Sequence, residues 1–505
     1  MLQLDVVRSA PAAGHDRART HAALILGIVG TAVGFAGSWI PSYWGDEAAS
    51  VLSATRTWPS LVALLGHVDG VHGVYYALLS VWVDVFGTSE IATRALSAIA
   101  VGAMVAGTVV LAREFVGARV AVWAGVVAIV LPRTTFMAAE ARSYALGSAA
   151  AVWAAVLLVR LLRRPGAPRR AWLAYAVVIA ACTYVFLYLG LLLVVHGAYV
   201  ALRHRTELRR WAAAAGLALV FSIPILVAGY HERRQIRFLE RRHYATAAHV
   251  LTKQWFGYPL LAVVGWMLMA GAIAWLVYAA RRRQPGRAGR ASLTVLAALW
   301  VVLPTAALLI VDATISPVYN VRYLSFGTPA VAILIALGVW AAAGVVADRR
   351  RALTAVAILG AVVVLSAPAY VGQRTPWAKD GGSDLRGVAD YVRANATAGG
   401  AVVFDQSTKP SRDPRLALDL YPDAFAGLRD VALATPYGDR ARLWDRTVPN
   451  AQAAASATQS PDIWAVELTQ GSAVPADVAL LEDLGYEVAS AHVIHRSTVY
   501  HLVRE

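Results

Sequence analysis

Long apolar runs recur along the first ~370 positions of the chain and predict its architecture. Runs of about 17–22 residues have the length that an α-helix needs to cross about 30 Å of hydrocarbon. We expect eleven membrane crossings, at residues 22–40, 91–112, 118–131, 145–162, 171–182, 186–202, 211–229, 259–280, 291–311, 328–347 and 351–367. The apolar stretch 73–86 is predicted instead to lie along the outer face or to dip into it.

Arginine clusters predict the orientation of this bundle. They lie in short loops at residues 160–170, 203–210, 281–290 and 349–351. Short cytoplasmic loops carry an excess of Lys and Arg, so these loops and the basic N-terminus are placed in the cytoplasm. Counting 73–86 as a crossing would invert every later cluster. Segment 22–40 is predicted to be retained as a helix, because it is long for a signal peptide and no small-residue cleavage site follows it.

The pattern changes after residue 368, where Pro, Gly and charged residues return. Periodicity predicts helices at 384–395 and 476–486, buried strands at 400–405 and 462–468, and a strand pair at 487–503. The fold class is therefore predicted to be mainly α. A polytopic membrane helix bundle (1–367) would precede a small α/β domain (368–505) on the outer side.

Composition supports a membrane protein. Hydrophobic residues make up 58% of the 505 residues and charged residues 15%, whereas charged residues are about a quarter of a soluble domain. The net charge of +15 resides mostly in arginines of short loops, so membrane orientation explains it and nucleic-acid binding does not. The single cysteine, Cys182, excludes an internal disulfide.

Polar side chains gather in the segments predicted to face outward. The first apolar run ends at "SWIPSYWGDEAAS" (38–50), which contains two adjacent acids. Ionisable groups at membrane depth are costly and usually mark a substrate path, so we expect the outward sets to converge on one site. The residues are Asp46 and Glu47; Asp69, His72, Tyr75 and Tyr76; Glu140, Arg142 and Tyr144; and Arg322 and Tyr323.

Structural roles are open for some of these groups. Asp46 follows a glycine before "EAASVLSA", which is a good helix start, so it is also predicted as an N-cap. Arg142 has the alternative of an internal ion pair with Glu140 or Asp46. Arg94 is predicted to pair with Glu90, four residues before it on one helix.

The order of the motifs resembles the C-type (GT-C) integral-membrane glycosyltransferases. "WGDE" is followed by "HVDGVHGVYYALLSVWVDVFGTSEIATRALSA", by a crossing, and by "LPRTTFMAAEARSYAL". This order is most similar to the protein O-mannosyltransferase-like branch and its actinobacterial mannosyltransferases. The resemblance covers residues 40–160 and the segment "RYLSFGTPA". Many relatives carry His-Pro-Pro-Leu-Tyr-Tyr where this chain has "HGVYY" (72–76), so the prolines that stiffen that turn are absent here.

The resemblance implies an inverting transferase in the plasma membrane. It would move one sugar, mannose, from a polyprenyl-phosphate donor to a hydroxyl of a glycolipid, glycan or protein on the outer face. The family's catalytic acid maps onto Asp46, with Glu47 beside it, and would take the acceptor's proton while the lipid phosphate leaves. A partly dry site and a neighbouring carboxylate are expected to raise the pKa of Asp46.

The other outward residues are expected to bind the donor phosphate or the substrate. They are Glu140, Arg142, Tyr144, Arg322, Tyr323, Asp69, His72, Tyr75 and Tyr76. Paired acids are compatible with Mg²⁺ or Mn²⁺, although two adjacent carboxylates do not define a metal site.

Two further alternatives follow from the sequence. An arabinofuranosyltransferase that uses decaprenyl-phosphoarabinose is the alternative within the class. A lipid or solute transporter is the alternative outside it, although the sequence shows neither the inverted repeats nor the broken helices that favour one. The arginine-rich loop 230–258 runs against the positive-inside trend. It is predicted either to lie on anionic headgroups or to hold the donor phosphate.

Overall fold

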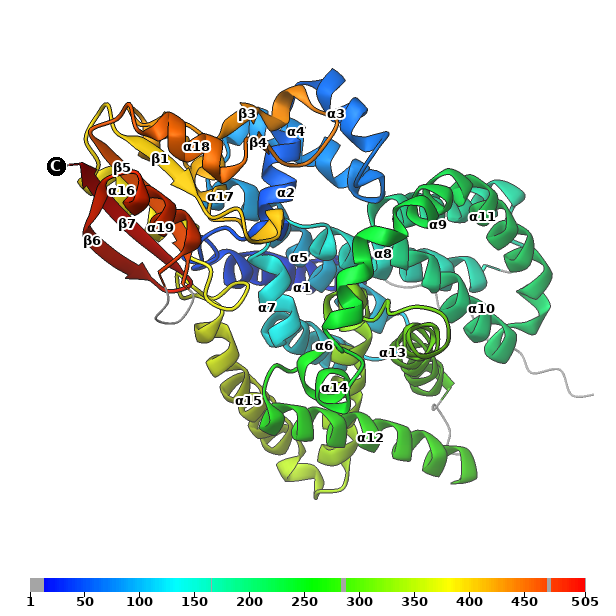
Figure 1. The fold of residues 1–505 in the computed structure, drawn as a ribbon. Coiled ribbons are helices and arrows are strands. Elements are labelled where there is room, and N and C mark those ends of the chain that lie inside the picture. The colour runs from blue at the N-terminus through cyan, green and yellow to red at the C-terminus, as the bar shows by residue number, and fades with distance from the viewer. Residues whose placement is uncertain (1–12, 165, 283–287, 470–473, 505) are drawn as a thin grey trace, which may run out of the picture.

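The structure, a computed structural model, describes residues 13–164, 166–282, 288–469 and 474–504. A bundle of long helices carries a smaller α/β unit at one end (Figure 1). The helices of the bundle and of its end next to the α/β unit are α1 (Ala13–Phe35), α2 (Gly45–Ala54), α3 (Trp58–Leu65), α4 (Gly73–Phe86), α5 (Glu90–Arg113), α6 (Ala118–Val130), α7 (Pro132–Ala138), α8 (Tyr144–Leu162), α9 (Arg169–Val185), α10 (Leu192–Arg203), α11 (Leu208–His231), α12 (Pro259–Arg282), α13 (Ala288–Thr314), α14 (Thr328–Gly344) and α15 (Asp348–Gly372).

The chain is a multi-pass membrane protein. In the described part of the chain, seven helices are long and apolar enough to cross a bilayer, or eight if the bent pair α6–α7 is one span. The remaining predicted crossings coincide with α1, α9 and α10, whose described apolar lengths fall below that test. Every predicted crossing thus lies on a helix, while the total of eleven stays a prediction.

The bend between α6 and α7 follows from the sequence. Proline disfavours helical backbone in the residue before it, and Leu131 before Pro132 has extended angles of φ −56° and ψ 131°. The two helices are therefore bent by 58°. This break, which the sequence pattern did not predict, brings the end of α7 and the turn after it to the candidate site.

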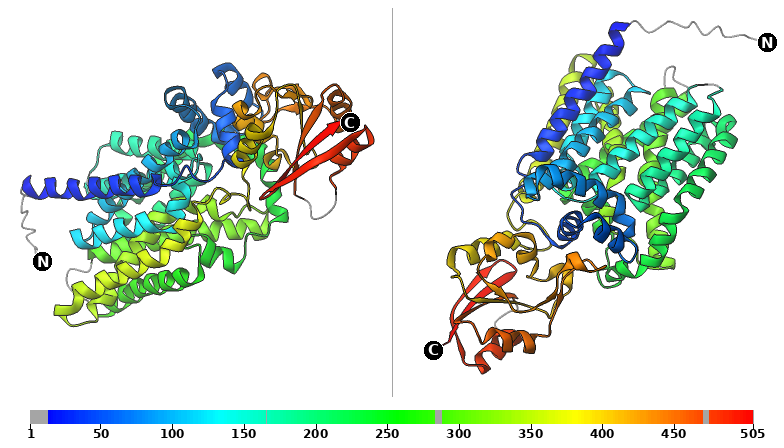
Figure 2. Two further views of the ribbon diagram at one scale, coloured as in Figure 1. Left: turned by 90° about the vertical axis from the view of Figure 1, so that its left-hand side faces the viewer. Right: turned by 90° about the horizontal axis from the view of Figure 1, so that it is seen from above.

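The end of the bundle next to the α/β unit holds α2, α3 and α4 (Figure 2). Figure 2 shows these blue helices next to the α/β unit, with the start of α1 at the opposite end of the bundle. The predicted surface stretch 73–86 is the short helix α4. This arrangement agrees with the predicted orientation, in which the first residues and the α/β unit lie on opposite sides; the sidedness itself stays a prediction.

The C-terminal unit is built on a five-stranded sheet of order β2-β1-β5-β7-β6. Strand β1 is parallel to β2 and β5, and β7 is antiparallel to β5 and β6. The strands are β1 (Ala401–Phe404), β2 (Arg429–Asp430), β5 (Asp462–Leu468), β6 (Tyr486–Ile494) and β7 (Ser497–Arg504), with β3 (Leu433–Thr435) and β4 (Arg446–Thr447) in a separate ladder. The helices are α16 (Leu385–Asn395), α17 (Leu416–Leu420), α18 (Asn450–Ala457) and α19 (Ala476–Asp483). The two predicted helices, the two buried strands and the strand pair are confirmed; β2–β4, α17 and α18 were not predicted.

Helix α2 packs into the α/β unit as well as against the bundle. Its residues Ala48 and Leu52 belong to the same apolar cluster as Val388 of α16 and other residues of the unit. A Cβ on Gly45 would lie 1.8 Å from the carbonyl oxygen of Ser411, so only glycine permits this approach. The predicted domain division at 367/368 falls inside α15, which ends at Gly372, and the division stays a prediction.

Candidate active site

The two adjacent acids that follow α1, Asp46 and Glu47, have different surroundings. Both lie in the first turn of α2, and the N-cap is Trp44, which makes no side-chain cap hydrogen bond. The prediction that Asp46 is the N-cap is therefore wrong. Because an α-helix has 3.6 residues per turn, successive side chains point about 100° apart. Glu47 turns into the protein and Asp46 turns away from it.

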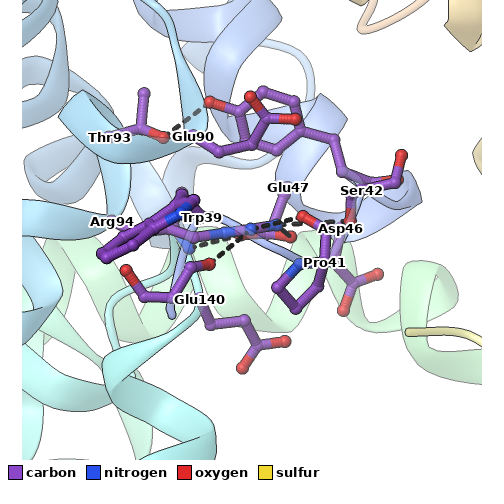
Figure 3. A network of polar contacts seen from close by, with 12 residues as sticks. Trp39, Pro41, Ser42, Asp46, Glu47, Glu90, Thr93, Arg94 and Glu140 are labelled. Atoms are coloured by element: carbon purple, nitrogen blue, oxygen red, sulfur yellow. Dashed lines mark hydrogen bonds and ion pairs between the residues drawn. The ribbon is translucent and has the colours of Figure 1, made fainter. Parts of the chain in front are cut away.

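Glu47 forms a fully buried ion pair with Arg94 of α5 (Figure 3). The guanidinium donates from Nε to Oε1 at 2.7 Å and from Nη2 to Oε2 at 2.6 Å. The predicted pairing of Arg94 with Glu90 is wrong. Glu90 instead accepts from Arg386 at 3.2 Å and from the Tyr421 hydroxyl at 2.6 Å.

The same ion pair holds several segments together. Oε1 of Glu47 also accepts from the backbone N–H of Ala141 at 2.8 Å. Arg94 Nη1 donates to the carbonyls of Ser38 and Pro41, at 2.8 and 2.6 Å. Because both of its oxygens accept hydrogen bonds, the Glu47 carboxylate is not free to share a cation with Asp46. Its contacts instead hold the backbone near Ala141 and, through Arg94, the backbone of Ser38 and Pro41.

Asp46 points instead toward Arg322 of the 3-10 turn η6 (Val321–Gly327). Its Oδ2 lies 2.6 Å from Nη1 of Arg322, and the Asp46 carboxylate keeps 31% of its exposure. The Arg322 guanidinium also lies 4.8 Å from the ring centre of Trp44. Burial alone would raise the pKa of Asp46, but the charges of Arg322 and Arg142 outweigh it and lower the pKa. The predicted raised pKa is therefore wrong for this state.

Arg142 lies on the other side of Asp46 and holds its backbone. Nη1 donates to the Asp46 carbonyl at 3.2 Å and to the Ser50 hydroxyl at 3.3 Å. Nη2 lies 3.2 Å from Nε2 of His72. Burial and the neighbouring Arg142 lower the pKa of His72 to about 4, so the ring is neutral near pH 7 and can accept this hydrogen bond. Nη1 also contacts the Tyr76 hydroxyl at 3.4 Å.

Asp69 completes this chain of contacts. Its Oδ2 accepts from the Tyr76 hydroxyl at 2.7 Å. Asp69, Tyr76 and Arg142, which are buried, and the half-buried His72 thus form one polar network behind Asp46, so these residues lie together as expected. Tyr75 packs in an adjoining apolar cluster with Leu61 and Leu64.

Glu140 and Lys379 are buried charged groups whose hydrogen-bonding capacity is unmet among the described residues. Glu140 is 0% exposed, and neither of its carboxylate oxygens accepts a hydrogen bond from a described residue. Its nearest ion-pair partner is Arg322, whose Nη1 lies 3.8 Å from Oε1. Lys379 is 3% exposed, and its Nζ has no hydrogen-bond partner in the described ranges and lies 4.3 Å from the ring centre of Phe136. Burial raises the pKa of Glu140 and lowers that of Lys379, and each charge opposes the other's shift.

Aromatic rings line another side of Arg322. Tyr323 stacks on Tyr188 with ring centres 4.7 Å apart and planes 19° from parallel. Phe186 meets Tyr144 edge-on at 5.5 Å and Tyr323 at 6.3 Å. Such rings offer an apolar face and hydroxyl tips, a lining that suits an amphipathic ligand.

Sequence reasoning did not single out Trp44, Ser50, Tyr188 or Lys379. Lys379 belongs to the segment after α15 that was assigned to the C-terminal domain, and no periodicity marks it as buried. The loop 230–258 does not form one amphipathic helix. It forms the 3-10 turn η4 (Glu232–Arg241) and a short π-helix (His249–Lys253). Glu232 accepts from the backbone N–H of Gly70 at 2.7 Å, so the loop packs against the turn that carries His72.

Comparison with protein-family profiles and with curated proteins gives no match. Solved structures do match. ArnT from Cupriavidus metallidurans bound to undecaprenyl phosphate superposes with a TM-score of 0.54 at 14% identity, over 97% of this chain and 98% of that one. The archaeal oligosaccharyltransferase AglB from Archaeoglobus fulgidus, in complex with an inhibitory peptide and a dolichol-phosphate, gives 0.51 at 10% identity, over 90% of this chain and 70% of that one. At such identities the likeness concerns the fold.

Proposed function

From a chain that has the GT-C membrane fold, we propose a polyprenyl-phosphate-dependent glycosyltransferase. It moves one sugar, mannose, to a hydroxyl of a glycolipid, glycan or protein at the outer membrane face. The observation that carries the proposal is the ion pair of the partly exposed Asp46 with Arg322. Beside it lie the buried Glu140 and Lys379, whose charged groups have no hydrogen-bond partner among the described residues. The ArnT and AglB structures that share the fold contain undecaprenyl phosphate and dolichol-phosphate, which supports a donor of this class.

Asp46 is the proposed general base. The acceptor hydroxyl gives its proton to a carboxylate oxygen of Asp46 as its own oxygen bonds the anomeric carbon. The bond from that carbon to the phosphate oxygen breaks on the opposite face, so the configuration inverts and polyprenyl phosphate leaves with one additional negative charge. The low pKa of Asp46 keeps it ionised before the donor binds.

Arg322 is proposed to change partners when the donor binds. A donor phosphate near Nη1 would compete with Asp46 for the same guanidinium, and charge-assisted pairs with phosphate are strong. Loss of this partner removes the main charge that lowers the pKa of Asp46. The donor would thereby make Asp46 a stronger base only once the leaving group is in place.

Lys379 is the second proposed phosphate ligand. Its ammonium group is buried with no hydrogen-bond partner in the described part of the chain, and such a group is costly unless an anion comes to it. Glu140 would balance this charge in the absence of donor. Arg142, through its contacts to the Asp46 carbonyl and Ser50, holds the backbone that aims the base.

The test uses the purified full-length chain in nanodiscs with radiolabelled polyprenyl-phosphomannose, and lipid extracts and secreted proteins as acceptors. Decaprenyl-phosphoarabinose serves as the parallel donor, and preference for it would replace mannose by arabinofuranose. Lys379→Gln should weaken donor binding at least ~10-fold, while the control Lys409→Gln, at an exposed position, should not. No transfer from either donor, with uptake of lipid or solute by proteoliposomes, would establish the transporter alternative.

A further inference from the structure

Three carboxylates meet in the C-terminal α/β unit, on elements that take no part in the candidate active site. Asp405 directly follows β1, Glu467 lies near the end of β5, and Asp477 lies in the first turn of α19. Because β1 and β5 are parallel, their carboxyl ends meet at one edge of the sheet, where α/β sheets bind ligands. One carboxylate oxygen from each residue lies within 4.8 Å of the other two.

Glu467 is the residue that indicates a missing ligand. It is 2% exposed, and its Oε1 has no hydrogen-bond partner in the described part of the chain. No Lys, Arg or His among the described residues forms an ion pair with any of the three carboxylates. Burial and the charges of Asp477 and Asp405 raise the pKa of Glu467 to about 9. Buried like charges without a counter-charge are costly, so the cluster needs a proton or a cation.

The other two carboxylates are already oriented by neutral donors. Asp405 accepts from the backbone N–H of Ser407 at 2.7 Å and from that of Leu468 at 3.3 Å. Asp477 accepts from the side-chain amide of Asn450. Each carboxylate oxygen has a second lone pair, so these bonds leave room for a metal.

We propose that Asp405, Glu467 and Asp477 bind a hard divalent cation, and that Ca²⁺ is the ion that fits. An oxygen-only donor set excludes a preference for soft metals. Two oxygens on one ion cannot lie farther apart than twice the metal–oxygen distance, which is about 4.6–5.2 Å for Ca²⁺ and about 4.0–4.2 Å for Mg²⁺. The three oxygens lie within 4.8 Å of one another, a spacing that Ca²⁺ can span without movement of the side chains, whereas Mg²⁺ requires every pair within about 4.2 Å.

The cation would also stabilise a segment that reaches the bundle. Asp405 begins the segment that leads to the 3-10 turn Pro410–Arg412. The carbonyl of Ser411 in that turn lies against Gly45 of α2. A bound ion at Asp405 therefore holds the start of the loop that covers the first turn of α2.

Equilibrium dialysis of the full-length chain with ⁴⁵Ca²⁺ tests the site. We expect one ion per chain with a dissociation constant of about 10⁻⁴–10⁻³ M, the range of extracellular modules. Glu467→Gln, which keeps the size and removes the charge, should weaken binding at least ~10-fold. Glu482→Gln on the same helix as Asp477, at an exposed position, is the matched control and should leave binding unchanged.

Thermal unfolding of the same preparations provides the second measurement. Saturating Ca²⁺ should raise the Tm of the wild type and of Glu482→Gln but not that of Glu467→Gln, because a ligand stabilises only the state that binds it. Asp477→Asn, at a less buried position, replaces Glu467→Gln if that variant does not fold, with the same expected loss. Absence of saturable Ca²⁺, Mg²⁺ and Mn²⁺ binding up to ~10 mM overturns the proposal and leaves a proton-sharing cluster.

Discussion

Replacing Glu47 with Gln should unfold the protein at a lower temperature without acting on the chemistry directly. Both side chains of the Glu47–Arg94 pair are 0% exposed. The variant leaves the Arg94 guanidinium buried without its counter-charge and turns an amide N–H toward a cationic N–H or toward the N–H of Ala141. The carbonyls of Ser38 and Pro41 still accept from Arg94, so its position is largely kept while its charge is not balanced.

The expected decrease of the Tm follows from the burial of the ion pair and from the length of the chain. Removing one partner of a buried ion pair costs about 3–5 kcal/mol. An unfolding entropy of about 2.1 cal mol⁻¹ K⁻¹ per residue over 505 residues is about 1.1 kcal mol⁻¹ K⁻¹. The expected decrease of the Tm for Glu47→Gln is therefore roughly 3–5 °C.

The measurement is the thermal unfolding of detergent-solubilised protein, followed by size-exclusion chromatography with fluorescence detection. The matched control is Glu114→Gln. Glu114 pairs with Arg160 and Arg163 at distances of 3.0 and 2.8 Å, but those arginines are 52% and 43% exposed. Exposed pairs contribute about 0–1 kcal/mol, so this variant should shift the Tm by less than ~1 °C.

The outcome also separates the two neighbouring acids. If Glu47→Gln keeps the wild-type Tm while sugar transfer falls at least ~100-fold, Glu47 is the base and the positioning role assigned to it is wrong. If the Tm falls and the folded fraction retains most of its turnover at low temperature, the positioning role stands.

The remaining predictions concern the base, the phosphate site, the pH profile and the topology. Asp46→Asn should lose at least ~100-fold in transfer rate while binding the donor at least as tightly as the wild type, because Arg322 loses the carboxylate with which the phosphate competes; near-normal turnover would remove Asp46 from the chemistry. Arg322→Ala should weaken donor binding by about 2–4 kcal/mol, measured by competition with labelled donor, and unchanged affinity would make this arginine structural. A base works only when deprotonated and the pKa of Asp46 is lowered in the free protein, so the acid limb of kcat should lie at higher pH than that of kcat/KM for the donor; identical limbs would contradict the exchange of partners by Arg322. In a Cys182→Ala background, cysteines placed at Asp46 and at the exposed Thr397 should react with an impermeant reagent from outside, and reaction only after permeabilisation would invert the topology.

The helices could be predicted because their cause is local. Apolar runs of bilayer length and arginines at their ends are properties of consecutive residues, and every predicted crossing lies on a helix. The buried strands β1 and β5 and the strand pair β6–β7 were also predicted from local patterns. The two-residue strands β2 and β4 were missed, because two residues are too few to establish a periodicity.

The sequence indicated which charged residues lie close together, but it did not indicate which of them form ion pairs. The spacing of Arg94 and Glu90 suits a helical pair, yet Arg94 binds Glu47, 47 residues earlier in the chain. That contact depends on how α2 packs against α5, which no local pattern specifies. The same reason hides Lys379, whose burial against Phe136 arises only when the segment after α15 folds back.

Helix α2 shows why the acids at its start could be found and yet have different roles. Its sequence marks a helix start, and helical geometry then sends neighbouring side chains in different directions. One carboxylate meets Arg94 from the bundle. The other carboxylate, that of Asp46, faces Arg322. The first turn of α2, which carries both acids, lies against the carbonyl of Ser411 in the α/β unit. The position of Asp46 therefore depends on both parts of the chain. The bundle holds α2 through Glu47. The α/β unit holds α2 through the apolar contacts of Ala48 and through the close approach of the Ser411 carbonyl to Gly45.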